Sequence, residues 1–177
     1  MGLKWVDIHR DLQDKLLNSV NHNAPQFNSQ AIANTLLALD QMGLKWVDIH
    51  RDLQDKLLKS VNHNAPQFNS QAIANTLSAL DGMGLVQTDL RDIIQCLTDT
   101  VTRLCPKFSF REIISCVEAF DHIGYYWQDF PNDFQLQLVT CIKECWPGLK
   151  SHESGMLMLR LSRLLVPREV LESFDVK

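Results

Sequence analysis

Residues 1–41 read MGLKWVDIHRDLQDKLLNSVNHNAPQFNSQAIANTLLALDQ, and residues 42–82 repeat this sequence almost unchanged. The two stretches are identical at 38 of 41 positions, and the differences are Asn18/Lys59, Leu37/Ser78 and Gln41/Gly82. A repeat of this length is typical of arrays in which each unit buries its apolar face against the next unit. The duplication therefore guides the interpretation of the whole chain.

The repeat continues in diverged form after residue 82. A third unit starts at Met83 and keeps the closing Gly124, and a fourth starts near Ile123 and keeps Trp127. We predict one helical-repeat domain over residues 1–177, with repeats at 1–41, 42–82, 83–122 and 123–166 and a C-terminal cap at 167–177. Because Met1 matches an internal position of the repeat, Met42, we expect the chain to begin partway through a unit, as a fragment or an unusual start of a longer array.

Each unit carries the pattern of two helices. Apolar residues spaced by three and four predict one helical stripe in the first half, at Trp5, Ile8, Leu12, Leu16 and Val20, and a second stripe at Ile32, Leu36 and Leu39. The segment 21–26, which contains Pro25, is expected to end the first helix. Asn28 suits the N-cap of the second helix, and Gly43 suits the left-handed residue after its end.

These features predict an all-α fold. The expected architecture is an α-solenoid of about four stacked helical hairpins, with eight or nine helices, because a two-helix unit cannot cover its own apolar face. Pro167 is expected to begin a short ninth helix that reaches Phe174. No stretch shows the alternation of a strand.

Composition excludes several classes of protein. The chain has 177 residues, of which 45% are apolar and 21% charged, and a net charge of −4. No run of 18 apolar residues is present, which argues against a membrane span, and the acidic balance argues against a strongly basic nucleic-acid-binding domain. Five irregularly spaced cysteines indicate reduced thiols and a cytoplasmic-type reducing compartment. Cys141, Cys145 and His152 fall short of a four-ligand zinc site, so no metal or cofactor is predicted.

No catalytic signature is present. The sequence lacks a Gly-rich phosphate loop, a His-Glu-x-x-His motif and a Gly-x-Ser-x-Gly motif. His9 and His50 are copies of each other, and a catalytic group is not expected to be copied along an array. We therefore expect no enzyme activity and no small-molecule substrate. Trp5, Trp46 and Trp127 share one repeat position and are interpreted as core residues between units.

The segments 30–39 and 71–80, which contain Asn-Thr-Leu-x-Ala-Leu before a Gly turn, resemble two families of helical repeats of 38–42 residues. One is the octotricopeptide repeats, which bind RNA in organelles. The other is the Skwp-type repeats, related to HEAT and armadillo repeats and found in secreted effectors of pathogenic bacteria. The second resemblance implies a scaffold for proteins, acting in the host cell cytosol. Both families favour Trp where this chain has Leu37, Ser78 and Glu118.

The candidate binding surface is a strip along the second helices. Its non-core positions are Gln30, Asn34, Leu37 and Gln41, then Gln71, Asn75, Ser78 and Gly82, then Arg111, Ser115, Glu118 and His122. The first three residues of each row are the predicted partner contacts. Two of the three differences between the copies, at 37/78 and 41/82, fall on this surface, as varied ligand contacts would. Chance variation at tolerant sites is the competing interpretation, and structural bonding of Asn34 and Asn75 between repeats is another.

The expected partner is a protein, bound without catalysis through this extended surface. Single-stranded RNA is the alternative partner, because Gln and Asn can read bases, although the strip offers only Arg111 to neutralise phosphate. A designed or consensus-like repeat protein is a third interpretation, against which the divergence of the third and fourth units argues.

Overall fold

The computed structural model describes residues 4–174, so the start of the expected first repeat and the end of the expected cap lie outside the described part. Within that range the chain forms nine α-helices, eight short 3₁₀ turns and no strand. The helices are α1 (Arg10–Asn23), α2 (Ser29–Gln41), α3 (Arg51–Asn64), α4 (Ser70–Gly82), α5 (Ile94–Leu104), α6 (Phe110–Ile123), α7 (Asn132–Cys145), α8 (Ser151–Arg163) and α9 (Arg168–Glu172). The predicted all-α class is confirmed.

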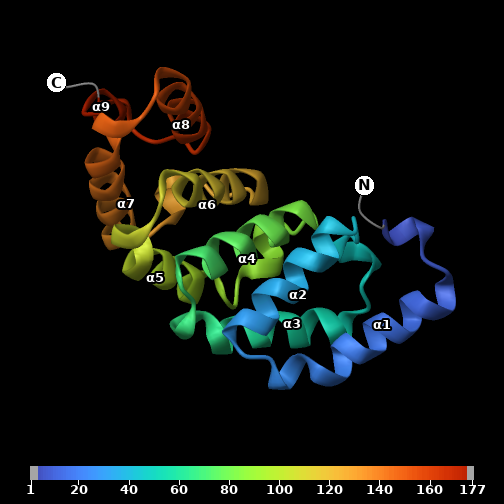
Figure 1. The fold of residues 1–177 in the computed structure, drawn as a ribbon. Helices are drawn as coiled ribbons and strands as arrows, with labels where there is room; N and C mark the ends of the chain where they lie inside the picture. The colour runs from blue at the N-terminus through green and yellow to red at the C-terminus, as the bar shows by residue number, and fades with distance from the viewer. Residues whose placement is uncertain (1–3, 175–177) are drawn as a thin grey trace.

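The helices form two layers. In one layer α2 packs against α4, α4 against α6, and α6 against α8, whereas in the other α1 packs against α3 and α5 against α7. Figure 1 shows both layers following a curved path from the blue to the red end of the chain, with α2, α4, α6 and α8 on the inner side of the curve. The molecule is an α-solenoid whose second helices line its concave side.

The first helix of each hairpin is shorter than the predicted stripe. Trp5 lies in a separate 3₁₀ turn, Trp5–Asp7, and α1 begins only at Arg10. Ile8 is extended, and the His9 imidazole caps the helix by accepting a hydrogen bond from the Asp11 N–H at 3.4 Å. The prediction that Trp5 and Leu12 share one helix was therefore wrong. The copied histidine His50 also caps its helix, α3, by accepting a hydrogen bond from the Leu53 N–H at 3.3 Å, which gives these residues a structural role.

The turns between paired helices follow local chemistry closely. Helix α1 continues to Asn23, three residues into the expected linker, and Pro25 falls in the 3₁₀ turn Ala24–Gln26 that follows the helix. The predicted N-cap is confirmed, since Asn28 Oδ1 accepts a hydrogen bond from the Ala31 N–H at 2.8 Å. At the other end of the second helices, Gly43 has φ +84° as predicted, and Gly84 and Gly124 are left-handed too, with φ +84° and +99°. Leu165 takes the corresponding place after α8, with φ 60°.

The core lies between the two layers. Ile32, Leu36 and Leu39 are buried as predicted, and Trp46 and Trp127 are buried while Trp5 is half-buried. The prediction of a buried stripe in the first unit was wrong at Leu12 and Leu16, which are exposed. Their copies Leu53 and Leu57 are fully buried, because the first hairpin packs against them. Within residues 4–174 no hairpin packs on the other side of α1.

Candidate binding surface

The predicted strip forms a continuous surface on the concave side. Residues three and four apart share one face of a helix, so Gln30, Asn34 and Leu37 line up along α2, opposite the buried Ile32 and Leu36. The equivalent rows on the neighbouring helices are Gln71, Asn75 and Ser78 on α4 and Arg111, Ser115 and Glu118 on α6. Every one of these nine side chains is exposed or half-buried. The packing of α2, α4 and α6 side by side brings the three rows together.

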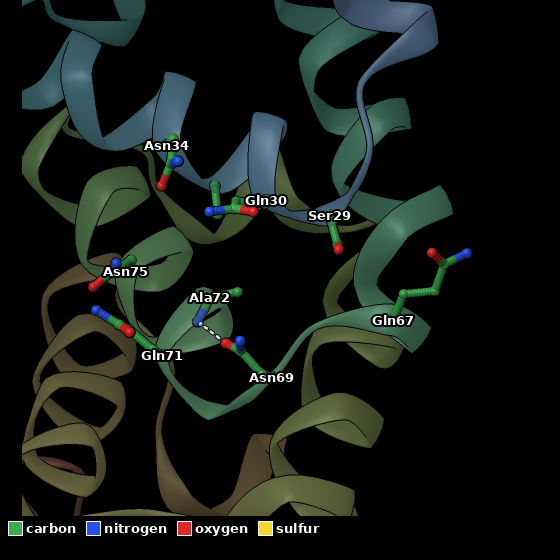
Figure 2. A pocket seen from close by; sticks show the side chains of 9 residues that line it. Ser29, Gln30, Asn34, Gln67, Asn69, Gln71, Ala72 and Asn75 are labelled. Carbon is green, nitrogen blue, oxygen red and sulfur yellow. Dashed lines mark hydrogen bonds between the residues drawn. The ribbon is translucent and has the colours of Figure 1, made fainter.

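The first part of the strip is a polar groove between α2 and α4. It has a volume of about 320 Å³. Its lining consists of Ser29, Gln30, Ala33, Asn34, Gln67, Asn69, Gln71, Ala72 and Asn75. Figure 2 shows Gln30 and Asn34 projecting from α2 toward the space that Gln71 and Asn75 of α4 border. No lining side chain is charged, so the groove offers hydrogen-bond donors and acceptors rather than a strong electrostatic potential.

Six side-chain amides line this groove. Among the described residues, the side chains of five of them, Gln30, Asn34, Gln67, Gln71 and Asn75, form no hydrogen bond, whereas Asn69 is used to cap α4 through the Ala72 N–H at 2.8 Å. The alternative in which Asn34 and Asn75 bond between repeats is therefore not what the structure shows. Each amide carries two donor hydrogens and an acceptor oxygen, so the groove presents both kinds of partner to a ligand.

A second groove continues the strip between α6 and α8. It has a volume of about 370 Å³. Arg111 and Ser115 line it together with Phe110, Ile114, His152, Glu153 and Met156. The sequence did not predict the residues of α8, because the surface positions of the fourth unit are too diverged to be matched to those of the other repeats. It also did not predict Ser29 and Gln67, although both lie within two residues of the capping residues Asn28 and Asn69, where the second helices begin.

Charged pairs occupy the far end of the second helices. The His122 Nδ1 lies 3.0 Å from Asp81 Oδ2, and Arg160 is paired with Glu118. The Arg163 Nε lies 2.9 Å from Asp121 Oδ2, as an ion pair without hydrogen-bond geometry. Each pair joins neighbouring helices of the inner layer. Glu118, predicted to contact a partner, is thus engaged within the array.

Burial raises the pKa of the Asp81 carboxyl, and the hydrogen bond from His122 opposes part of that rise. Asp40, its counterpart on α2, also has a raised pKa, first because of burial and then because Asp81 lies nearby, while Lys45 acts in the opposite direction. Both carboxyls therefore lie close enough to the helix junctions to lose part of their hydration.

The difference between Gln41 and Gly82 has a packing explanation. A Cβ atom on Gly82 would lie 2.1 Å from Asp40 Oδ1 and 2.6 Å from its carboxyl carbon. The Asp40 carboxyl would have to move to admit any side chain there. Packing against Asp40 therefore accounts for the glycine at position 82. The Leu37/Ser78 difference remains on the open strip.

Three of the five cysteines, Cys105, Cys116 and Cys141, are buried free thiols. Burial raises the pKa of the Cys105 and Cys116 thiols well above the usual value, and neighbouring thiols of Cys141 and Cys145 raise that of Cys105 further. Thiols held protonated are poor nucleophiles and poor metal ligands. Between residues 4 and 174, no three His, Cys, Asp or Glu side chains are grouped closely enough to hold a metal ion.

Comparison with known families bears on the first two hairpins. Residues 1–36 and 42–77 each match a family model described as "Protein of unknown function (DUF1601)", and together they cover less than half of the chain. The matches agree with a tandem helical repeat, but they name no octotricopeptide, HEAT or armadillo family. No curated protein matches the sequence. In the described range, none of the helices is both long enough and apolar enough to cross a bilayer.

Proposed function

We propose that this α-solenoid is a non-catalytic scaffold that binds an extended segment of another protein along the inner strip. The observation that carries the proposal is the uncharged groove between α2 and α4, with five side-chain amides that make no hydrogen bond inside the described chain. Amides left open on a concave surface are suited to a ligand that supplies both donors and acceptors.

An extended polypeptide meets this requirement. Its backbone offers an N–H and a C=O at each residue and advances about 3.3 Å per residue. Helices packed side by side are about 8–10 Å apart, so amides on successive helices fall beside peptide groups about three residues apart. Asn34 and Asn75 occupy equivalent positions of adjacent helices and supply this spacing. Asn and Gln would then hold the backbone, while Leu37, Ser78 and Arg111 contact side chains.

Charge supports a protein partner over RNA. Binding along a phosphate backbone depends on Lys and Arg that displace counterions. Arg111 is the one cation among the nine strip positions, and the nearby Arg160 and Arg163 are paired with Glu118 and Asp121. The amide rows could read bases, but the strip would hold phosphates weakly.

The test uses the whole chain and a phage-displayed library of random 12-residue peptides. Peptides selected by the unchanged chain are expected to lose at least about tenfold in affinity for an N34A/N75A variant, since each lost pair of hydrogen bonds is worth about 1–3 kcal/mol. The matched control is N18A/K59A, a pair of exposed positions on the first helices, which should bind as the unchanged chain does. Methylation of the peptide's backbone nitrogens should weaken binding while its side chains remain the same.

Two results would overturn the proposal. One is a failure to select any peptide, or selection of peptides that bind N34A/N75A equally well. The other is tight binding of a fluorescent random-sequence single-stranded RNA pool that weakens steeply with salt and with the R111A substitution. That outcome would replace the peptide with RNA. Circular dichroism should show unchanged helix content in all variants, because the substituted side chains are exposed or half-buried.

A further inference from the structure

The first and second hairpins place the same residues in two different environments. Leu12 is 49% exposed, but its copy Leu53 is 0% exposed. Leu16 is 37% exposed, and its copy Leu57 is 0% exposed. The residues and their places in the helix are the same. The preceding hairpin covers Leu53 and Leu57. Its helix α1 and the 3₁₀ turn after it, Ala24–Gln26, pack against α3.

The second helix of the first hairpin shows the same contrast. Ala38 on α2 is exposed, whereas its copy Ala79 on α4 is fully buried. Thr35 is half-buried, and its copy Thr76 is fully buried. The uncovered area therefore extends across both helices of the first hairpin. We call the side formed by Leu12, Leu16, Asn23 and Ala38 the outer face.

A polar side chain on the outer face also lacks the partner that its copy has. Asn64 donates through Nδ2 to the Phe27 carbonyl oxygen of the preceding hairpin at 2.8 Å, as well as to the Ser60 carbonyl at 2.9 Å. Asn23 makes only the second kind of bond, to the Ser19 carbonyl at 2.8 Å. The next junction uses an equivalent acceptor, since Arg103 donates to the Phe68 carbonyl at 3.3 Å. Asn23 therefore has a donor hydrogen available for the carbonyl that a preceding hairpin would place where Phe27 lies relative to Asn64.

The inner layer supplies one more matching group, Gln41. At each of the three junctions, an aspartate near the end of one second helix faces the last turn of the next second helix. The pairs are Asp40 with Gly82, Asp81 with His122, and Asp121 with Arg163. His122 and Arg163 meet that aspartate with a donor group, and Gly82 leaves room for it. Gln41 holds the corresponding position of the first hairpin and is exposed. Its amide can donate to an aspartate as His122 does.

We propose that the outer face is a docking surface for a further helical repeat of this same type, stacked as the first hairpin is stacked on the second. The occupant must bring a carbonyl for Asn23, an aspartate for Gln41 and an apolar side for Leu12 and Leu16. In the described chain, each hairpin's side that could cover the outer face already packs against the element that follows it. The first three hairpins each cover the next one, and α9 packs on α8 with Phe174 stacked on Trp146 at 5.4 Å between ring centroids. The occupant is therefore a repeat additional to residues 4–174.

The test joins a second copy of residues 1–41 directly before Met1 of the full chain. The added hairpin should fold onto α1 and raise Tm by about 5 °C or more in a single transition, because a buried junction of this kind adds cooperative stability. Hydrogen exchange of the α1 amides should slow. An extension of the same composition in scrambled order should do neither.

Substitutions on α1 show whether the outer face is responsible. L12Q/L16Q should remove the gain in the extended chain while changing the Tm of the 177-residue chain little. The matched control, D14Q/N18Q, alters positions whose copies Asp55 and Lys59 stay exposed, so it should leave both chains unchanged. The proposal is overturned if the extension unfolds separately, or if L12Q/L16Q acts equally on both chains. A dimer of the 177-residue chain in sedimentation velocity that L12Q/L16Q abolishes would also overturn it, by making a second copy the occupant. None of these residues lies on the inner strip, so the outcome is independent of the proposed peptide site.

Discussion

The first two hairpins have nearly the same sequence, but they differ in what surrounds them. Trp46, Leu53 and Asn64 are buried on the second hairpin, whereas their copies Trp5, Leu12 and Asn23 are half-buried or exposed on the first. The difference shows that a residue in this array owes much of its burial to the neighbouring hairpin rather than to its own. Pairs of identical substitutions in the two hairpins therefore measure the contribution of a junction directly.

The largest contrast is expected at the tryptophans. Trp46→Ala should lower the free energy of unfolding by about 3–5 kcal/mol, because it empties a fully packed site. Trp5→Ala should cost about 1–2 kcal/mol, since its side chain is only half-buried. Urea denaturation followed by circular dichroism measures both. Equal losses would show that burial by the neighbouring hairpin contributes little at this position.

An intermediate contrast is expected at the asparagines. Asn64→Ala removes the hydrogen bond to the Phe27 carbonyl and leaves that junction with one donor fewer, at a cost of about 1–2 kcal/mol. Asn23→Ala removes only an exposed bond within α1 and should cost about 0.5 kcal/mol or less. The measurement is the same denaturation curve. A cost for Asn23→Ala that matches that of Asn64→Ala would place the effect inside the helix rather than at the junction.

The smallest contrast is expected at the aspartates of the inner layer, and it depends on pH. The pKa of Asp40 is raised by burial, so its contribution to stability is greatest below the usual aspartate pKa and is lost as the pH rises through the raised value. Asp40→Asn should therefore stabilise the protein slightly at pH 7, and this gain should vanish toward pH 3. Solvent screening keeps the effect small.

Asp81→Asn provides the matched comparison for that pH effect. Its carboxyl has a raised pKa as well, but the ionised form gains the hydrogen bond with His122 at 3.0 Å. The gain at pH 7 should be smaller than for Asp40→Asn, or replaced by a loss. Thermal unfolding of both variants at several pH values decides the matter. A larger gain for Asp81→Asn would contradict the assigned role of His122.

The sequence predicted more of the fold than of the surface. Repeat length, the Asn28 cap and Gly43 place the second helices correctly, because capping and left-handed conformations depend on a few neighbouring residues. The strip positions were also predicted, because helical spacing alone puts Gln30 and Asn34 opposite the core. The grooves could not be predicted in full, since His152 and Met156 reach the strip from a diverged hairpin.

The amino-acid sequence by itself determined the second helices with their caps and glycine turns, the order of the hairpins and the polar side of each second helix, because these follow from local geometry and periodicity. Only the tertiary structure decided that Leu53 is buried and Leu12 exposed, that Glu118 is paired with Arg160, and that Gly82 gives room to Asp40. The reason is physical. Burial, ion pairing and close approach are properties of two hairpins in contact, and identical sequences acquire different values of each when their neighbours differ.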